Sequence, residues 1–455
     1  MTSVEQLKAA VPRRLIFLLV CSLLSAVSAQ FAQTLFAAPV GAQTRPTAAQ
    51  PLRNADFATR LAHVKSLLKT TPLVDSHNDL PWAMREFANA PLDVEAYDLN
   101  TTTKGMTDIA RLRKGMVGGQ FWSVYIPGEI RDSGYARVQL EQIDIARRVI
   151  ARYPKDLKWA LTAAEVRAAY KSGKIGSLLG MEGGHAIENS LGALRAYYDL
   201  GARYMTLTHN VTLDWADAAN DVPKHNGLTN FGKEVVREMN RLGMLVDLSH
   251  VSPAVMSNAL DVSEAPVIFS HSAARGLTDV PRNVPDSILA RLPRNGGVVM
   301  MTFVPGFTSQ KVADYATRAT QFRDSVAKAN PNNNDAQFKA FAAWRERNPS
   351  PVATIADVAD HMDRIKRLAG AQHIGIGGDY DGITETVVGL EDVSKYPDLL
   401  AELVKRGWTD SELRGVAGEN ILRALSRAEI VSARLRKTRP ASTKTIQQLD
   451  GRRTQ

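Results

Sequence analysis

The stretch that decides the fold is Leu73-Val-Asp-Ser-His77-Asn-Asp79, where a short apolar run ends in residues that can hold a metal ion or move a proton. In an α/β barrel the active site lies at the carboxyl ends of the parallel strands, so such endings should recur along the chain. They do recur, in Ser177-Leu-Leu-Gly-Met-Glu182, Tyr204-Met-Thr-Leu-Thr-His209, Met244-Leu-Val-Asp-Leu-Ser-His250, Val267-Ile-Phe-Ser-His271 and Ile374-Gly-Ile-Gly-Gly-Asp379.

Eight apolar runs are candidate strands, and most are nearly continuous rather than alternating, which is typical of strands buried on both faces of a parallel sheet. They cover residues 73–78, 118–126, 174–181, 204–208, 243–249, 266–270, 296–303 and 373–378. Helical patterns lie between them, for example over 231–242 with Thr229 or Asn230 as N-cap and Gly243 as the stop. The pattern predicts an α/β fold, a (β/α)8 TIM barrel of the metal-dependent hydrolase type. A doubly wound open sheet is the alternative, but the phosphate-binding glycine pattern it needs after the first strand is missing.

The first 29 residues read as an export signal, with Lys8, Arg13 and Arg14 before an apolar run and small residues at Val27-Ser-Ala29 for cleavage. The run is short for a membrane span, so we expect no stable span after cleavage and an exported protein, in a bacterial periplasm or outside the cell. The only cysteine, Cys21, lies within this signal, which excludes cysteine as a nucleophile, ligand or disulfide partner in the mature chain.

The rest of the chain divides into a flexible linker over 30–54, a barrel domain over 55–430 and a basic flexible tail over 431–455. The polar stretch 308–350 is too long for a plain connection and predicts an inserted helical lid or flap between strands seven and eight. The formal net charge is +9, but the signal and the tail account for nearly all of it, so the body is close to neutral and a nucleic-acid partner is not supported.

Five residues at these strand ends form a candidate metal site. His77 and Asp79 are two residues apart, so both side chains point to the same face of an extended strand. Glu182, His250 and His271 end other strands, and five N/O ligands exceed what one catalytic ion with an open position uses. We therefore expect two ions bridged by the carboxylate of Glu182. Such ligands suit Zn²⁺, although other divalent metals are compatible.

Three further residues have candidate catalytic or substrate-binding roles. Asp379, after Gly377-Gly378, is the expected general base, with Asp381 as the competing carboxylate. His209 is expected to polarise the substrate carbonyl, and Arg282 to hold a substrate carboxylate through its bidentate fork. The other histidines have no partner spacing and are expected at surface or capping positions: His63, His225, His361 and His373.

These motifs resemble those of the membrane (renal) dipeptidase family of binuclear zinc peptidases. The likeness runs from about residue 70 to 425 and is carried, in the family's order, by Asp75-Ser-His-Asn-Asp-Leu-Pro81, Gly180-Met-Glu-Gly-Gly-His185, Leu207-Thr-His-Asn210, Asp247-Leu-Ser-His-Val-Ser252, Phe269-Ser-His-Ser272, Arg282-Asn-Val-Pro285 and Gly377-Gly-Asp-Tyr-Asp-Gly382. The resemblance implies the same five metal ligands, two zinc ions per chain, and the same roles for His209, Arg282 and Asp379.

The resemblance also implies a homodimer that hydrolyses dipeptides, including those with a C-terminal D-residue, through a metal-bridging hydroxide. One departure concerns the substrate pocket: where animal members place a tyrosine near strand seven, this chain reads Met301-Thr-Phe-Val-Pro-Gly306. Two alternatives stay open. The chain could be a related amidohydrolase acting on N-acyl amino acids, cyclic amides or lactams, or a catalytically silent exported binding protein.

Overall fold

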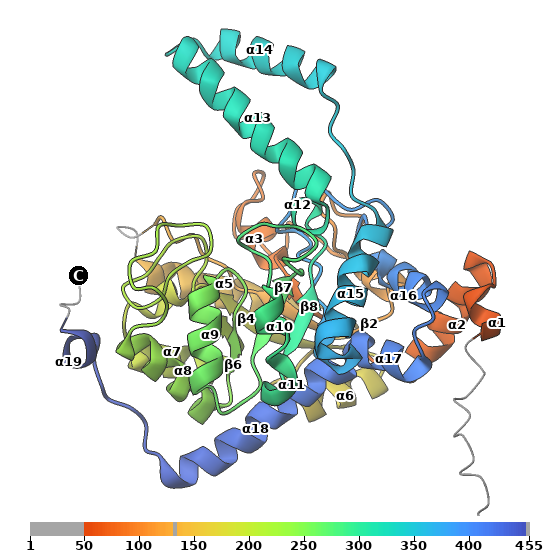
Figure 1. The fold of residues 1–455 in the computed structure, drawn as a ribbon. Helices are drawn as coiled ribbons and strands as arrows, with labels where there is room; N and C mark the ends of the chain where they lie inside the picture. The colour runs from red at the N-terminus through yellow and green to blue at the C-terminus, as the bar shows by residue number, and fades with distance from the viewer. Residues whose placement is uncertain (1–49, 131–133, 452–455) are drawn as a thin grey trace, which may run out of the picture. The chain divides into compact units, whose positions relative to one another are not determined.

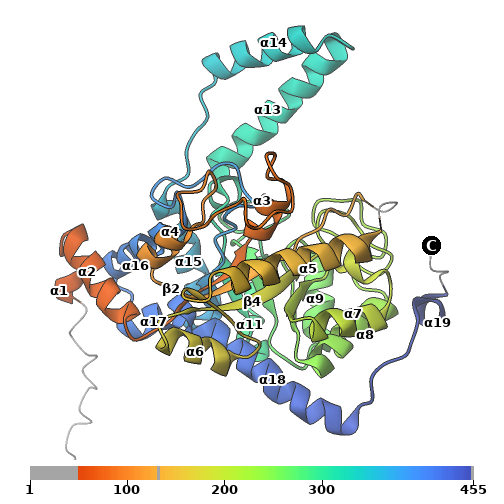
Figure 2. The ribbon, with the colours of Figure 1, turned by 180° about the vertical axis from the view of Figure 1, so that it is seen from behind.

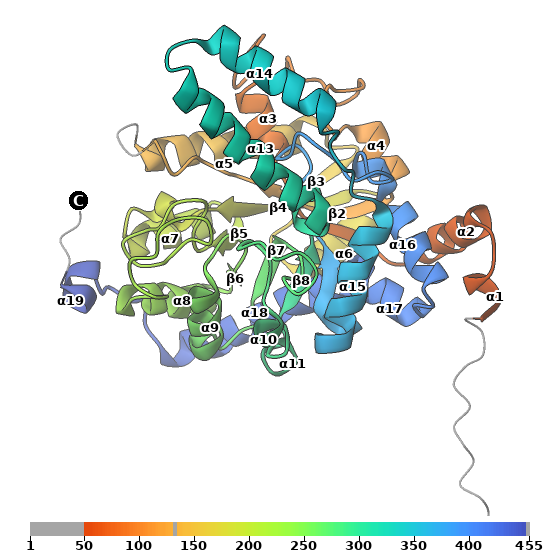
Figure 3. The same ribbon diagram turned by 45° about the horizontal axis from the view of Figure 1, so that its top comes forward.

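The computed structural model describes residues 50–130 and 134–451, and its centre is a closed barrel of parallel strands. Figure 3 shows these strands inside a ring of helices. The strands are β1 Leu73–Asn78, β2 Val117–Ser123, β3 Leu157–Trp159, β4 Ile175–Glu182, β5 Ala202–Thr206, β6 Leu245–Asp247, β7 Ile268–Ser272, β8 Val298–Met301 and β9 Ile374–Ile376. The predicted export signal, and residues 30–49 of the predicted linker, lie outside the described residues.

Eight of the nine strands close the barrel in the order β1-β2-β4-β5-β6-β7-β8-β9, and every pairing is parallel. The ring closes where Asp75 of β1 pairs with Ile376 of β9. All barrel strands are buried along their whole length, as expected for a parallel sheet covered by helices. The (β/α)8 prediction is therefore confirmed: all eight predicted strands are present, the first at the predicted bounds and the others at slightly different ones.

The ninth strand, β3, was not predicted. It pairs only with the first residues of β4, where Leu157 lies opposite Ile175. Its three residues include the exposed Lys158, so it has no apolar run to mark it. It lengthens one edge of the barrel without entering the closed ring.

Helices connect the strands and cover the outside of the barrel (Figures 1 and 2). They are α1 Gln50–Arg53, α2 Phe57–Leu68, α3 Leu80–Arg85, α4 Ile109–Lys114, α5 Tyr135–Arg152, α6 Ala163–Lys171, α7 Leu191–Asp199, α8 Asn230–Leu242, α9 Pro253–Val262, α10 Asp286–Leu289, α11 Leu292–Asn295, α12 Pro305–Thr308, α13 Gln310–Ala329, α14 Asn334–Arg347, α15 Ile355–Ala369, α16 Tyr396–Lys405, α17 Asp410–Arg414, α18 Asn420–Thr438 and α19 Ile446–Asp450. None of these described helices is long and apolar enough to cross a membrane.

Helix α8 shows how local sequence sets these bounds. The Thr229 side chain caps its first turn by accepting a hydrogen bond from the Gly232 N–H at 3.2 Å. Gly243 ends it in the left-handed region at φ 87°, a conformation that favours glycine. Both ends agree with the prediction.

The insertion between β8 and β9 forms the helical hairpin α13–α14, which projects from the barrel (Figure 1). Its aromatic rings pack on one another, with Phe322 and Phe341 stacked on Trp344 at centroid distances of 5.4 and 5.9 Å. No residue of α13 or α14 lines the metal-site cavity described below. The hairpin is helical as predicted, but in this structure it is not a lid over the site.

The predicted flexible tail is instead ordered through residue 451. Helix α18 runs across the predicted boundary at residue 430, and its Val431 and Leu435 are buried against the body. Ile446 of α19 is also buried, and the carboxylate of Asp450 accepts hydrogen bonds from the first N–H groups of α8. The prediction failed because it weighed the many basic residues and overlooked apolar residues at helical spacing.

Candidate metal and catalytic site

The predicted site residues meet at the carboxyl ends of the barrel strands, as expected for this fold. Six of them line a cavity of about 540 Å³, namely Asp79, Glu182, His209, His250, Arg282 and Asp379, while His77 and His271 lie behind its wall. His77 and His271 are almost fully buried, and Asp79, Glu182 and His250 are less than a tenth exposed. The structure therefore brings all five predicted metal ligands to one place.

Glu182 lies at the centre of this cluster. Its Oε1 is 3.0 Å from Nε2 of His250 and 3.3 Å from Nε2 of His271, while its Oε2 is 3.4 Å from Nε2 of His77. The two oxygens of the carboxylate thus face different histidines. This is the arrangement that a bridging carboxylate between two ions requires.

A buried chain of hydrogen bonds fixes the proton on the His271 ring. The Ser270 hydroxyl donates to the carboxylate of Asp247 at 2.6 Å, so it must accept at its other contact, from Nδ1 of His271 at 2.9 Å. Asp247 is itself held by the backbone N–H groups of Ser249 and Ser270. With its proton on Nδ1, His271 presents an unprotonated Nε2 to the cavity.

The same reasoning applies to His250. Its Nδ1 lies 3.3 Å from the amide oxygen of Asn210, an acceptor, so Nδ1 carries the proton and Nε2 carries a lone pair. The Nε2 atoms of His250 and His271 are only 2.9 Å apart, and both face Oε1 of Glu182. The lone pairs of these two Nε2 atoms and of Oε1 therefore meet in a buried place, where they repel one another unless a cation lies between them. The donor set therefore fits a metal ion.

On the other side of Glu182, His77 and Asp79 offer a second group of donors. Nε2 of His77 is 3.3 Å from Oδ2 of Asp79. Neither this Nε2 nor Oδ1 of Asp79 has a hydrogen-bond partner among residues 50–130 and 134–451. His77 is oriented from behind by the Tyr204 hydroxyl, 2.7 Å from its Nδ1. The Tyr204 ring fits there because Gly180 has no Cβ, which would overlap it.

Asp379 lies at the edge of this second group. Its backbone N–H donates to the His77 carbonyl at 3.2 Å, and its Oδ1 is 3.9 Å from Nε2 of His77. Asp379, Asp381 and His250 all have left-handed backbones, at φ 64°, 64° and 65°, an unfavourable conformation that is concentrated at functional sites. Asp381 instead accepts from the Met106 N–H at 2.7 Å, which favours Asp379 as the base.

Arg282 and His209 line the cavity beside the cluster. Arg282 is 2% exposed, and its Nε and one terminal nitrogen have no hydrogen-bond partner among the described residues, so its guanidinium can receive a bidentate anion. Burial lowers the pKa of Arg282 to about 10, which leaves it charged at neutral pH. His209 packs its ring edge-on against Tyr125 at 4.8 Å.

Charge and burial set the protonation states of the cluster. Burial lowers the pKa of both His250 and His271 well below the usual range, so both rings are neutral, as metal ligands must be. Burial tends to raise the pKa of Glu182, but the surrounding histidines outweigh it and hold that pKa well below its usual value. Burial raises the pKa of Asp379, and the neighbouring carboxylates of Asp79 and Glu182 raise it further.

Some lining residues were not predicted from the sequence. Tyr125 follows β2, Trp82 and Glu86 lie in and just after α3, and Phe307 lies in α12 beneath the Arg282 guanidinium at 5.2 Å. Only their positions just after strand ends could have suggested them. Phe307 and Tyr125 supply aromatic surface to the cavity, although the segment Met301–Gly306 at the end of β8 contains no tyrosine.

Two histidines expected at surface or capping positions are buried instead. His361 is 1% exposed; its Nδ1 accepts from the Ala274 N–H and its Nε2 donates to the Thr308 carbonyl. His373 is 3% exposed and contacts the Gly297 carbonyl. Both link segments that are far apart in sequence, which their local spacing could not reveal.

The parallel barrel and its cluster of histidines and carboxylates define the class of barrel metallohydrolases. A family model described as membrane dipeptidase, peptidase family M19, matches residues 61–439. The chain therefore belongs to the membrane dipeptidase family, a family of metallopeptidases.

Solved structures agree with this assignment. A metallopeptidase from Rhodobacter sphaeroides, liganded with a phosphinate mimic of the dipeptide L-Ala-D-Ala, is 25% identical, with a TM-score of 0.64, over 79% of this chain and 99% of its own. A dipeptidase AC of family M19 is 26% identical, with a TM-score of 0.65 and the same coverage. The probable dipeptidase PvdM from Pseudomonas aeruginosa shares the fold at 21% identity and a TM-score of 0.71, over 82% of this chain and 99% of its own.

Proposed function

We propose that this protein hydrolyses dipeptides at a pair of divalent metal ions, with Zn²⁺ as the expected metal. The observation that carries the metal part is the meeting of unprotonated Nε2 atoms of His250 and His271 with the Glu182 carboxylate. His250, His271 and Glu182 would hold one ion, and His77, Asp79 and Glu182 the other. Such ions polarise a scissile carbonyl and lower the pKa of an attacking water.

Arg282 supports a substrate with a free carboxylate. A buried guanidinium without an anionic partner is costly, and a substrate carboxylate would satisfy its free N–H groups in a bidentate pair. The cavity of about 540 Å³ is of a size for small molecules. Both features favour a dipeptide over a longer chain.

His209 and Asp379 would act on the peptide bond itself. Burial lowers the pKa of His209, so its ring is neutral and can donate a hydrogen bond to the carbonyl oxygen as negative charge develops there. The Asp379 carboxylate would take a proton from the attacking water and deliver it to the departing amine. Both residues line the same cavity as Arg282, so one bound dipeptide can contact all three.

The C-terminal residue of the substrate is proposed to include D-amino acids. This part rests on the relative from Rhodobacter sphaeroides, which binds a mimic of L-Ala-D-Ala. We further propose that the protein is exported and acts as a homodimer, on the basis of its N-terminal sequence and its family.

A substrate panel tests this function. The purified mature protein should release amino acids from L,L and L,D dipeptides, and release should stop after chelation and return on addition of Zn²⁺. Hydrolysis of N-acyl amino acids or lactams without hydrolysis of any dipeptide would replace the proposal by the amidohydrolase alternative. Metal binding without any hydrolysis would favour the silent binding protein.

A further inference from the structure

A second cavity, of about 700 Å³, lies at the opposite end of the barrel from the metal site. Its wall includes Pro72, Val117 and Lys174, which stand at or just before the first residues of β1, β2 and β4. Because β1 spans six residues, this cavity is roughly 15–20 Å from the metal ligands at the other end of that strand. Catalysis at the metal site therefore does not account for it.

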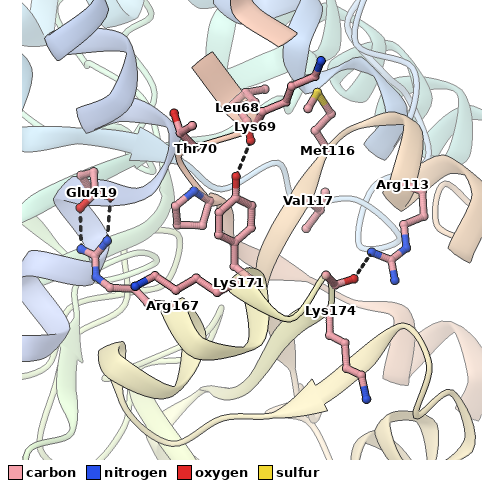
Figure 4. A pocket seen from close by; sticks show the side chains of 13 residues that line it. Leu68, Lys69, Thr70, Arg113, Met116, Val117, Arg167, Lys171, Lys174 and Glu419 are labelled. Carbon is pink, nitrogen blue, oxygen red and sulfur yellow. Dashed lines mark hydrogen bonds and ion pairs between the residues drawn. The ribbon is translucent and has the colours of Figure 1, made fainter. Parts of the chain in front are cut away.

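Basic side chains dominate the wall of this cavity. Five of its lining residues are Lys or Arg and only one is acidic: Lys69, Arg113, Arg167, Lys171, Lys174 and Glu419. Figure 4 shows Arg167 and Lys171 on one side of the pocket, Arg113 and Lys174 on the other, and Lys69 above. A concave wall with one sign of charge concentrates anions.

The single carboxylate is already neutralised. Glu419 makes a two-pronged ion pair with Arg167, at 2.7 and 2.5 Å. Arg113 is likewise engaged, with Asp156 at 2.8 Å and with the Gly173 carbonyl at 2.7 Å. Within the described ranges, no hydrogen bond or ion pair is found for the ammonium groups of Lys69, Lys171 and Lys174. Three cations are thus available to a ligand.

The ends of helices α2 and α6 also border this cavity, and their carbonyl groups would repel an anion. The Leu68 carbonyl at the end of α2 is covered, since it accepts from the Tyr170 hydroxyl at 2.6 Å, and the Gly173 carbonyl just after α6 accepts from Arg113. The rest of the wall includes an apolar part, made by Leu68, Val117 and half-buried Met116. Met116 has a left-handed backbone at φ 56°, an uncommon conformation for this residue.

We propose that this cavity binds an organic phosphate. The three free ammonium groups suit the spread charge of a phosphate, for which lysine is a common partner, and the apolar wall suits an attached hydrocarbon or aromatic group. A soluble phosphate ester and a lipid headgroup share this chemistry. The proposal does not depend on the dipeptidase activity, because no lining residue belongs to the metal site.

Binding of phenyl phosphate to the full mature protein, measured by calorimetry, tests the proposal. Phenyl phosphate should bind more tightly than inorganic phosphate, and added salt should weaken it because the lysines are near the surface. The triple variant Lys69→Gln, Lys171→Gln, Lys174→Gln should bind about tenfold more weakly. Its dipeptide turnover should be unchanged, which also shows that it has folded.

A matched variant with the same loss of charge, Lys311→Gln, Lys328→Gln, Lys339→Gln on the hairpin, should bind phenyl phosphate like the unmodified protein. Vesicles that contain phosphatidylglycerol distinguish the two sources of the phosphate. If the vesicles capture the protein and the lysine variant loses this capture, the ligand is a lipid headgroup. If the protein binds phenyl phosphate but not the vesicles, the ligand is a soluble ester. The proposal is overturned if neither probe binds, or if both triple variants lose binding equally.

Discussion

The Nε2 atoms of His250 and His271 lie 2.9 Å apart, and hydrogen bonds at the opposite ring nitrogens leave both of them unprotonated. Two lone pairs at this distance are unfavourable without a cation between them. A cation held by both atoms would remove this repulsion, so the contacts at the opposite ring nitrogens should matter for metal binding.

Removal of the Ser270 hydroxyl should weaken metal binding. In Ser270→Ala the Nδ1–H of His271 loses its acceptor, so the ring is free to change tautomer and orientation. Loss of such an outer contact typically costs 10- to 100-fold in metal affinity. Competition with a chelating dye measures this affinity directly, without any activity assay.

Ser272→Ala is the matched control, since this buried hydroxyl contacts Ser249 rather than a histidine ring. It should bind metal nearly as well as the unmodified protein. Equal affinities for Ser270→Ala and the unmodified protein would remove Ser270 from its positioning role.

Asp379→Asn should abolish most turnover but leave the protein able to bind metal. The amide has nearly the same shape but cannot accept a proton, and general-base catalysis is typically worth 10²- to 10⁴-fold. The measurement is kcat together with metal content by mass spectrometry. Asp381→Asn should retain much more activity, because its amide oxygen can still accept from the Met106 N–H; the reverse order would transfer the role to Asp381.

Arg282→Met should raise KM for dipeptides about 30-fold or more, because the substrate carboxylate loses its charged, buried partner. Dipeptide amides, which have no such carboxylate, provide the internal control. They should be poor substrates for the unmodified protein and should lose little further in the variant. If the variant discriminates against the amide as strongly as the unmodified protein does, another residue binds the carboxylate.

Protonation of His361 should destabilise the fold in mild acid. Burial lowers its pKa to about 4, below the value of 6.5 expected in the unfolded chain. Between these values the unfolded state binds the proton more tightly, so stability is present above about pH 6.5 and is lost as the pH falls. At about pH 5 this residue alone would cost about 2 kcal/mol.

His361→Gln removes this titration, although it also lowers stability at neutral pH by disturbing the contacts to Ala274 and Thr308. Urea unfolding of both proteins at about pH 7.5 and about pH 5 gives the difference. The loss of stability on acidification should be smaller in the variant. The same loss in both proteins would show that His361 is not the group responsible.

Strand ends such as His77 and His271 were predictable because a buried parallel strand leaves an unmistakable apolar run and the barrel topology gathers its ends. The short strand β3 was not predictable, because Lys158 interrupts its apolar residues. The packed tail was not predictable either, because basic residues such as Arg434 and Lys437 obscure the helical spacing of its apolar residues. A local sequence pattern is a poor guide to burial where only a few residues of a segment are buried.

In the site, too, some features could be predicted from the sequence and others could not. The cluster of candidate metal ligands was predictable from residue type at strand ends. The supporting contacts were not, since Ser270 and Tyr204 look like ordinary strand residues until the barrel closes. Phe307 in α12 and Tyr125 after β2 likewise reach the cavity only through the path that the chain takes after a strand. Tertiary geometry, and not sequence spacing, determines these roles.

The most direct test of the central claim is metal content by mass spectrometry on the purified mature protein, paired with amino acid release from dipeptides before and after chelation. Our account predicts two metal ions per chain and release that chelation stops and Zn²⁺ restores. Purified protein that binds no divalent metal, or dipeptide hydrolysis that survives complete removal of metal, would contradict it.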